Sequence, residues 1–390
     1  MTAWPKGKVS IATNALCEYI KGKKVALMMN VSSTDNDGSF VMDNIIKDGG
    51  AKVEFFISME HGVRGNFQGC YSDSADVDTK TGVEIVSLYK TTLQEQAERI
   101  KKLDAVVFSA QDIGLRHWTF TAMMYKLISL CTEIDTEVIV LDRPNPLRGD
   151  IVEGEIAKKY IGMHNVSSYN EFRYPLRHGM TIGELANMYN EERNVGARLK
   201  VFTMEGYKRD MWFEDTGLLW MAPTPNMVTA ENALNYATTG LLQGANLALG
   251  RRTTTPYKYV GSDYINGEEL ATELNGRDIP GVFFMQKYCE AAIGGPNYVD
   301  EIISCDGVEI CIYDKEIYSP TYAQLQLIDA LVKLYGDKLN LEVNELARIR
   351  MCSDEVCDAV KNGESLLPII PVWKKSSEEF MRLREKYLLY

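Results

Sequence analysis

The sequence lacks long apolar segments. Stretches such as Val25 to Met29 and Val138 to Leu141 are only strand length, far short of the roughly 20 residues that span a bilayer. No apolar stretch follows Lys6 and Lys8 near the N-terminus, so a secretory signal is not expected. Glycine and proline, 30 and 12 residues, are scattered along the chain. We therefore expect a folded, cytoplasmic protein that is not held in a membrane.

Cysteine and histidine are also scarce. Eight cysteines stand at positions 17, 70, 131, 289, 305, 311, 352 and 357 without a CxxC pair, and there are four histidines. This pattern is typical of buried thiols in a reducing compartment, and it argues against a disulfide scaffold. Because no cluster has the spacing of zinc ligands, we expect no metal site.

Positive charge is in the minority. The chain has 42 Lys and Arg against 54 Asp and Glu, a net charge of −12. Nucleic acids and anionic membranes are bound through clustered Lys and Arg, so neither is expected as a partner. With 390 residues, 45% of them hydrophobic, the chain is long enough for two or three domains with buried cores.

The N-terminal half alternates short apolar runs with helical patterns, which indicates βαβ units around a parallel sheet. Strands are predicted at Lys24–Asn30, Lys52–Glu60, Ala105–Asp112, Glu137–Asp142 and Leu199–Met204. Thr181 and Glu184 fit a capping box at the start of a helix, and His178 is expected to serve the turn before it. We predict an α/β, Rossmann-like domain over 1–228, ending after a proline-containing loop at 220–226.

The remaining residues, 229–390, predict a smaller α+β domain. Helical patterns run over Ala230–Leu249, Tyr322–Tyr335 and Ser376–Tyr387, and strands are predicted at Gly281–Tyr288 and Val308–Tyr313. The change from alternating strands and helices to this mixed order is the reason for placing a boundary near residue 228.

Charged residues gather where the predicted strands end. The second strand runs into Glu60-His61-Gly62-Val63-Arg64, the third into Gln111-Asp112-Ile113-Gly114-Leu115-Arg116, and the fourth into Asp142-Arg143-Pro144-Asn145. Carboxyl ends of parallel strands form the ligand crevice of an open α/β sheet. Taken alone, Asp112 is explained as a cap of the next helix and Asp142 as a turn former. The coincidence at three strand ends favours a functional site.

Nucleotide and serine-hydrolase signatures are missing. There is no GxGxxG after the first strand, no P-loop and no GxSxG elbow. A pocket rich in carboxylates and arginines without a phosphate cradle suits a sugar with an acidic substituent. Carboxylates supply acid and base at a glycosidic bond, and arginine binds a carboxylate in a planar fork. No cofactor is expected.

Several motifs together resemble one known family. They are Glu60-His61-Gly62-x-Arg64-Gly65, Gln111-Asp112-Ile113-Gly114-x-Arg116, Asp142-Arg143-Pro144-Asn145-Pro146, Val152-Glu153-Gly154, His178-Gly179-Met180-Thr181-Ile182-Gly183-Glu184, Pro223-x-Pro225-Asn226-Met227 and Gly250-Arg251-x-Thr253-Thr254. In this order, and over nearly the whole chain, they resemble the exo-β-N-acetylmuramidases of peptidoglycan recycling, NamZ-like hexosaminidases formerly known as a domain of unknown function.

The resemblance implies a Rossmann-like domain whose cleft is completed by the smaller domain. It also implies release of N-acetylmuramic acid from the non-reducing end of peptidoglycan fragments, by hydrolysis of the β-1,4 bond to N-acetylglucosamine. The substrates would be muropeptides or the disaccharide of the two sugars. The alternative function is a non-catalytic protein that binds muropeptides or sugar acids on the same fold, and the presence of Glu60 and Asp112 favours the enzyme.

By this resemblance Glu60 is the leading catalytic carboxylate, and apolar Phe55, Phe56 and Ile57 before it suit a general acid. Asp112 or Glu153 is expected to orient water or stabilise the transition state, with the substrate acetamido group as an alternative nucleophile. The predicted substrate-binding residues are His61, Arg64, Gln111, Arg116, Arg143, Asn145, Asn226, Asn246 and Arg251. We hypothesise that Arg64, Arg116 or Arg251 pairs with the lactyl carboxylate of the muramic sugar.

The chain departs from the family pattern at a few positions. Val63 stands where family members usually have Phe. Gln243-Gly244-Ala245-Asn246 replaces Glu-Gly-Thr-Asn, and Leu249 replaces a Glu before the Gly-Arg motif. Two carboxylates are therefore missing from a segment expected to face the cleft, a change that bears on the substrate.

Overall fold

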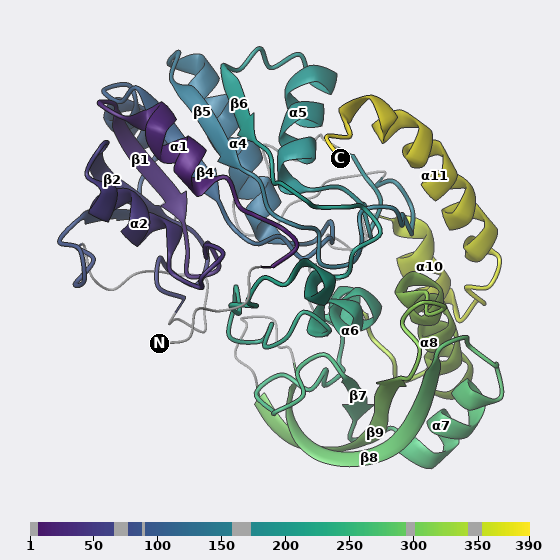
Figure 1. Ribbon diagram of the computed structural model, residues 1–390. Coiled ribbons are helices and arrows are strands. Elements are labelled where there is room, and N and C mark those ends of the chain that lie inside the picture. Colours follow the sequence, from purple (N-terminus) through teal and green to yellow (C-terminus); the bar gives the residue numbers. More distant parts are fainter. Residues whose placement is uncertain (1–6, 66–76, 88–89, 158–172, 294–300, 342–352) are drawn as a thin grey trace.

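The computed structural model describes residues 7–65, 77–87, 90–157, 173–293, 301–341 and 353–390. They form a domain with a parallel sheet and a smaller domain with an antiparallel sheet (Figure 1). Within these ranges no helix combines the length and the apolar character needed to cross a membrane.

The N-terminal domain contains a six-stranded parallel sheet in the order β3-β2-β1-β4-β5-β6. The strands are β1 Lys24–Met29, β2 Lys52–Ser58, β3 Glu84–Ser87, β4 Ala105–Ser109, β5 Glu137–Leu141 and β6 Leu199–Phe202. All the strands predicted for this domain are confirmed, each ending one to three residues earlier than predicted. The edge strand β3 was missed because it is short and half-exposed. Strand order reverses between β1 and β4, which is the topological switch point of the sheet.

Helices cover both faces of this sheet. They are α1 Thr13–Ile20, α2 Val41–Asp48, α3 Leu93–Ile100, α4 Thr119–Glu133 and α5 Ile182–Glu192. Side chains of β1 alternate between two cores: Val25 and Leu27 pack with α1 and α2, whereas Ala26 and Met28 pack with α3, α4 and α5. The expected capping box of α5 is present, with Thr181 as its first cap. This alternation explains why the strands are almost wholly apolar.

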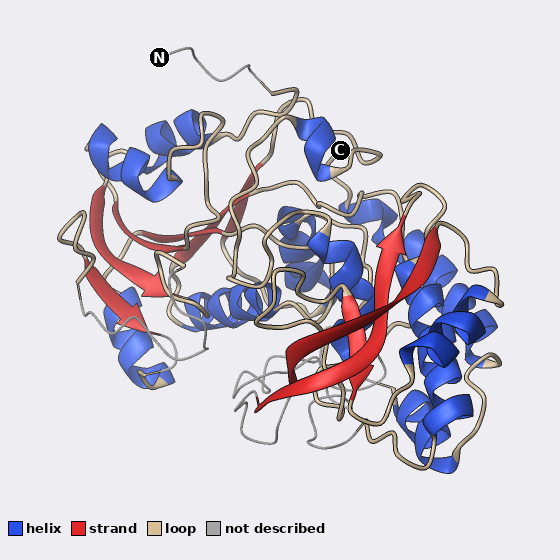
Figure 2. Cartoon of the chain, turned by 90° about the horizontal axis from the view of Figure 1, so that it is seen from below, coloured by secondary structure: helices blue, strands red, loops and turns tan. Residues whose placement is uncertain are grey.

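The second domain contains a three-stranded antiparallel sheet in the order β7-β9-β8. Its strands are β7 Tyr259–Ser262, β8 Val282–Ile293 and β9 Glu301–Ile312, and its helices are α6 Asn232–Thr239, α7 Gly267–Asn275, α8 Pro320–Tyr335, α10 Asp354–Asn362 and α11 Ile369–Arg384. Short 3-10 helices lie at η2 Phe213–Thr216, η3 Gly240–Leu242 and η4 Glu385–Tyr387. The helix predicted through Leu249 ends at Thr239, the short η3 follows to Leu242, and the chain then turns at Gly244, which adopts φ of 120°. Figure 2 shows the two sheets as separate groups of strands.

The last part of the chain returns from the second domain to the first (Figure 1). The Ser377 hydroxyl of α11 donates to the Gly154 carbonyl at 2.9 Å. Beyond η4, the Tyr390 hydroxyl donates to Asp142 Oδ2 at 2.7 Å and accepts from the Met204 backbone N–H at 2.9 Å. Residues near position 390 therefore complete the packing of β5, β6 and α5.

The cysteines are placed largely as the sequence suggested. Cys131, Cys305 and Cys357 are buried, while Cys17, Cys289 and Cys311 are partly buried, and all six are free thiols. Burial raises the pKa of Cys131 to about 12, so its thiol is not a nucleophile near neutral pH. Cys70 and Cys352 lie outside the described residues.

Candidate active site

Glu60 lies just beyond the end of β2, at the carboxyl edge of the sheet. Its side chain is 14% exposed, and Thr119 Oγ1, in the first turn of α4, donates to its Oε2 at 2.5 Å. His61 Nε2 lies 3.8 Å from Oε1. His61 and Gly62 have φ of 68° and 81°, so the chain turns sharply in a left-handed conformation. A non-glycine residue held in that region is uncommon, and such conformations cluster at functional sites.

Asp112 and His178 form a buried pair beside this edge. His178 Nε2 lies 3.2 Å from Asp112 Oδ2, which also accepts from the Gly114 N–H at 2.7 Å. The Met180 N–H donates to His178 Nδ1 at 3.2 Å, so in the neutral ring the proton is on Nε2, facing the carboxylate. The Nε2–H is not aligned for a hydrogen bond, so this contact is electrostatic. Asp112 Oδ1 is buried and has no hydrogen-bond partner among the described residues.

Glu153 lies in the seam between the domains. Its Oε1 is 3.3 Å from Arg177 Nη1, and Thr321 Oγ1 of α8 donates to its Oε2 at 3.4 Å. Arg177 is fully buried, and burial lowers its pKa. Both carboxylate oxygens of Glu153 therefore have partners, one from each domain.

A cluster of buried polar side chains occupies the switch point, and we call Asn30, Ser32, Thr34, Gln111 and Arg143 the switch-point cluster. The Gln111 backbone N–H donates to Ser32 Oγ at 3.0 Å. Arg143 Nε donates to Gln111 Oε1 at 3.4 Å, and its Nη2 donates to Thr34 Oγ1 at 3.3 Å. The cluster thus joins the carboxyl ends of β1, β4 and β5.

Two of the predicted substrate-binding arginines are already engaged within the protein. Arg64 pairs with Asp43 at 2.9 Å and with Asp78 at 2.7 Å, and these carboxylates raise its pKa. Arg116 Nη1 donates to the backbone carbonyls of Glu155 at 2.6 Å and Tyr174 at 3.2 Å. Both side chains therefore hold loops together in this structure.

The remaining predicted residues are spread over both domains. Asn145 is buried and its Nδ2 donates to the Met180 carbonyl at 3.0 Å. Asn226 lies half-buried in the loop after η2. Asn246 joins two segments of the second domain, since its Nδ2 donates to the Lys338 carbonyl at 2.9 Å. Arg251 is half-buried in a loop of the same domain. The structure therefore brings Glu60, Asp112 and the switch-point cluster to the sheet edge, and it places Asn246 elsewhere.

The second domain reaches this edge through the aromatic side chain of Tyr236 in α6. The rings of His117 and Tyr236 are 4.5 Å apart, and Tyr236 also contacts the Tyr257 ring at 4.4 Å. There is no room for a side chain at Gly240, because a Cβ there would lie 2.6 Å from His117 Nε2. Three departures from the family pattern lie in cores nearby: Val63, Ala245 and Leu249 are buried apolar side chains. Sequence reasoning did not foresee that these positions pack in the interior.

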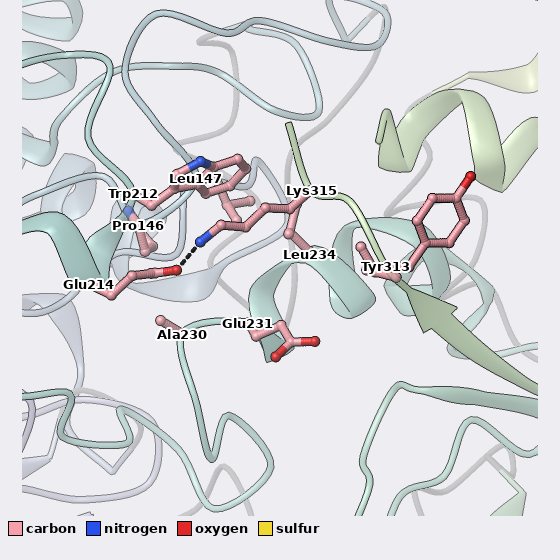
Figure 3. Close-up of a pocket in the computed structure, with 10 residues that line it drawn as sticks. Pro146, Leu147, Trp212, Glu214, Ala230, Glu231, Leu234, Tyr313 and Lys315 are labelled. Carbon is pink, nitrogen blue, oxygen red and sulfur yellow. Dashed lines mark hydrogen bonds and ion pairs between the residues drawn. The ribbon is translucent and has the colours of Figure 1, made fainter. Parts of the chain in front are cut away.

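A pocket of about 340 Å³ opens between the domains (Figure 3). Its lining includes Pro146, Leu147, Trp212, Glu214, Tyr313 and Lys315. Lys315 pairs with Glu214, and its Nζ lies 4.7 Å from the centre of the Trp212 ring. Pro146 and Leu147 continue directly from the Asp142-Arg143 segment, so the pocket adjoins the carboxyl edge of β5. Among the described residues, no group of three or more His, Cys, Asp or Glu side chains could hold a metal ion.

Thr119 and the Asp112–His178 pair were not found by sequence reasoning. Thr119 stands 59 residues from Glu60 in the sequence, and no local pattern links the two residues. The His178 pattern pointed to a turn, and its contact with Asp112 depends on how the loop before α5 folds back on β4. Neither contact has a local sequence motif.

Comparison with known proteins gives consistent results over the whole chain. Models of the N-terminal and C-terminal parts of the exo-β-N-acetylmuramidase NamZ match residues 25–231 and 234–390. The peptidoglycan β-N-acetylmuramidase NamZ of Bacillus subtilis strain 168 is 32% identical, over 99% of this chain and 92% of that protein.

Two crystal structures of DUF1343 family proteins from Bacteroides fragilis NCTC 9343 have the same fold. One has a TM-score of 0.86 at 28% identity and covers 99% of this chain and 100% of its own. The other has a TM-score of 0.75 at 26% identity and covers 98% of this chain and 99% of its own. The Rossmann-like architecture and the family resemblance predicted from the sequence are thereby confirmed, and the chain belongs to the NamZ family of exo-β-N-acetylmuramidases.

Proposed function

We propose that this protein is an exo-acting glycoside hydrolase that releases N-acetylmuramic acid from the non-reducing end of peptidoglycan fragments. Family membership supports the reaction class, because the Bacillus subtilis relative carries the name of a peptidoglycan β-N-acetylmuramidase. The observation that carries the proposal is the Glu60 carboxyl group at the sheet edge, partly exposed and held by Thr119. The bond cleaved is the β-1,4 linkage to N-acetylglucosamine.

Glu60 is the general acid of the proposed reaction. The Thr119 hydroxyl donates to Oε2, which fixes the orientation of the carboxyl group, and we assign the catalytic proton to Oε1. That proton passes to the glycosidic oxygen as its bond to the muramic C1 breaks, so the leaving sugar departs as a neutral alcohol. Water, either directly or after the substrate acetamido oxygen has bonded to C1, supplies the new oxygen at C1. Such a group contributes about 10²- to 10⁴-fold to the rate.

Asp112 is the better placed of the two candidates for the second role. Its Oδ2 is held by Gly114 and faces His178, whereas its Oδ1 has no protein partner in the part of the chain that the structure describes. Oδ1 can therefore accept a hydrogen bond from water or from the acetamido N–H of the substrate. Glu153, by contrast, already has Arg177 and Thr321 as partners, which suits a residue that joins the domains.

The proposal is tested with the disaccharide of β-1,4-linked N-acetylmuramic acid and N-acetylglucosamine, following release of the free muramic sugar by chromatography. The wild type should release it, and Glu60→Gln should lose at least about 10²-fold in kcat. Glu54→Gln is the matched control, because Glu54 lies on the same strand and pairs with Lys52 at the surface. Equal activity of Glu60→Gln and wild type would contradict the role of Glu60. Binding without release by the wild type would favour a sugar-acid-binding protein instead.

We further propose that the protein acts in the cytoplasm on muropeptides or on the disaccharide itself. The scarcity of cysteine and the absence of a CxxC pair support a reducing compartment. Cell fractionation with an antibody against the protein tests the location. Recovery of the protein mainly from the medium or the wall fraction would overturn it.

A further inference from the structure

The Arg143 side chain has few partners for a buried cation. It is 2% exposed, and it forms no ion pair with any residue that the structure describes. Its Nε and Nη2 make long hydrogen bonds, at 3.4 and 3.3 Å, to the neutral side chains of Gln111 and Thr34. Its Nη1 has no hydrogen-bond partner among those residues.

Other buried or half-buried arginines of this chain are matched by anions or carbonyls. Arg64 pairs with Asp43 and Asp78, Arg177 with Glu153, Arg209 with Glu184, and Arg277 with Glu273 and Asp329. Arg384 donates to the backbone carbonyls of Gly149, Gly179 and Asp150. Arg143 stands apart from this set because its described hydrogen-bond acceptors are neutral side chains.

Burying the Arg143 guanidinium without an ion-pair partner costs free energy of folding. A buried charge without a counter-ion loses its hydration and gains little in return. Accordingly, burial lowers the pKa of Arg143 to about 10. The carboxylates of Asp35 and Asp142 offset this loss only in part, since neither forms an ion pair with the guanidinium. The Asp142 oxygens instead accept from Thr181, Gly183 and Tyr390. An anion bound to the guanidinium would relieve this cost, because it would supply the missing counter-charge and hydrogen-bond acceptors.

The place of Arg143 agrees with a ligand at the sheet edge. It follows β5, and Glu60 follows β2, so three inter-strand spacings of about 4.8 Å separate their strands. Two long side chains reaching inward can bridge that distance with one sugar ring between them. Muramic acid differs from glucosamine in a lactyl ether at C3 that ends in a carboxylate, and a guanidinium binds a carboxylate through a planar fork.

We propose that Arg143 is the specificity-determining residue that binds the lactyl carboxylate of the muramic sugar, with Gln111 and Thr34 orienting its guanidinium. This inference rests on the proposed function. It assigns to Arg143 the role that the sequence suggested for Arg64 or Arg116, whose guanidinium groups already bind groups of the protein. The loop at 220–227 lies over the cluster, since Asn30 Nδ2 donates to the Pro223 carbonyl at 3.4 Å.

The test compares three chromogenic substrates: para-nitrophenyl β-N-acetylmuramide, the same compound with a neutral lactyl methylamide, and para-nitrophenyl β-N-acetylglucosaminide. In the wild type, kcat/KM for the free carboxylate should exceed that for the amide by about 10- to 100-fold, the range of a charge-assisted hydrogen bond. In Arg143→Met that ratio should fall to near unity. Arg143→Lys, which keeps the charge but not the fork, should retain part of it. Arg99→Met, an exposed arginine paired with Glu84, is the control and should keep the full ratio.

Several outcomes overturn the inference. An unchanged ratio in Arg143→Met does so, and so does loss of the ratio in Arg116→Met or Arg251→Met instead. If Arg143→Met does not fold, as judged by circular dichroism, the wild type still tests the inference. Equal wild-type kcat/KM values on the free carboxylate and on the methylamide would exclude a cation that recognises the lactyl carboxylate. If the wild type cleaves no muramide at all, the proposed function fails. Calorimetric binding of N-acetylmuramic acid against N-acetylglucosamine, to wild type and Arg143→Lys, then tests Arg143 separately.

Discussion

Removing the hydroxyl of Tyr390 should destabilise the protein, and by more at pH 8 than at pH 5. This hydroxyl donates to Asp142 Oδ2 at 2.7 Å and accepts from the Met204 N–H at 2.9 Å. Asp142 is fully buried, and desolvation raises its pKa from 3.8 to about 6, although hydrogen bonds from Thr181, Gly183 and Tyr390 oppose the rise.

The pH dependence follows from that pKa. Because the folded protein binds the Asp142 proton more tightly than the unfolded chain does, ionising Asp142 lowers the free energy of unfolding as the pH rises from about 4 to about 6. At pH 8 the carboxylate is charged, and the Tyr390 hydroxyl then makes a charge-assisted bond worth about 1.5–3 kcal/mol. At pH 5 the carboxyl group is mostly protonated, and a neutral hydrogen bond is worth only about 1 kcal/mol.

Urea unfolding of wild type and Tyr390→Phe at pH 5 and pH 8, followed by fluorescence, measures both losses. We expect a loss of about 2–3 kcal/mol at pH 8 and about 1 kcal/mol at pH 5. Tyr313→Phe is the control, because Tyr313 is 70% exposed and its substitution should have almost no effect at either pH. An equal loss at both pH values, or a larger loss at pH 5, would refute the reasoning that Asp142 is charged at pH 8.

Two further predictions follow from the site. Thr119→Val should lower kcat by about 10-fold with little change in KM, because Oε2 of Glu60 loses its hydrogen-bond donor. Thr119→Ser should restore most of the activity. A Thr119→Val variant as active as the wild type would contradict the orienting role of Thr119. Gly114→Ala should lower the free energy of unfolding by about 2–4 kcal/mol, since φ is 77° and the new Cβ would lie 2.4 Å from Asn145 Oδ1. Gly196→Ala is the control, because Gly196 has φ of 75° and no atom within 4 Å of the new Cβ, and its free energy of unfolding should fall by only about 1 kcal/mol. Urea unfolding measures both variants. An equal loss of unfolding free energy in the two would show that the contact with Asn145 is unimportant.

The sheet and its carboxyl edge were predictable because the relevant signals are local. Apolar runs such as Val25 to Met29 can be recognised as strands from the sequence. The carboxyl ends of the strands in a parallel sheet then lie along one edge by geometry. Glu184 was likewise expected to cap its helix, since a capping box spans three residues, and its carboxylate does so.

The contacts within the site could not be predicted in the same way. Thr119, His178 and the unpaired state of Arg143 depend on how distant loops fold together. The lack of an ion pair between Arg143 and any described carboxylate is visible only in the structure. The buried positions of Ala245 and Leu249 depend equally on packing between α6 and the rest of the second domain.

The return of α11 and the following residues also sets an order for folding during synthesis. Met204 and Asp142 receive their partner from Tyr390, which is 186 residues beyond Met204. At 5–20 residues per second, a ribosome needs roughly 10–40 s to make that stretch. During this interval the edge formed by β5, β6 and α5 carries a buried carboxylate without its phenol and a backbone N–H without its acceptor. We therefore expect the edge formed by β5, β6 and α5 to gain its full stability only after Tyr390 has been made.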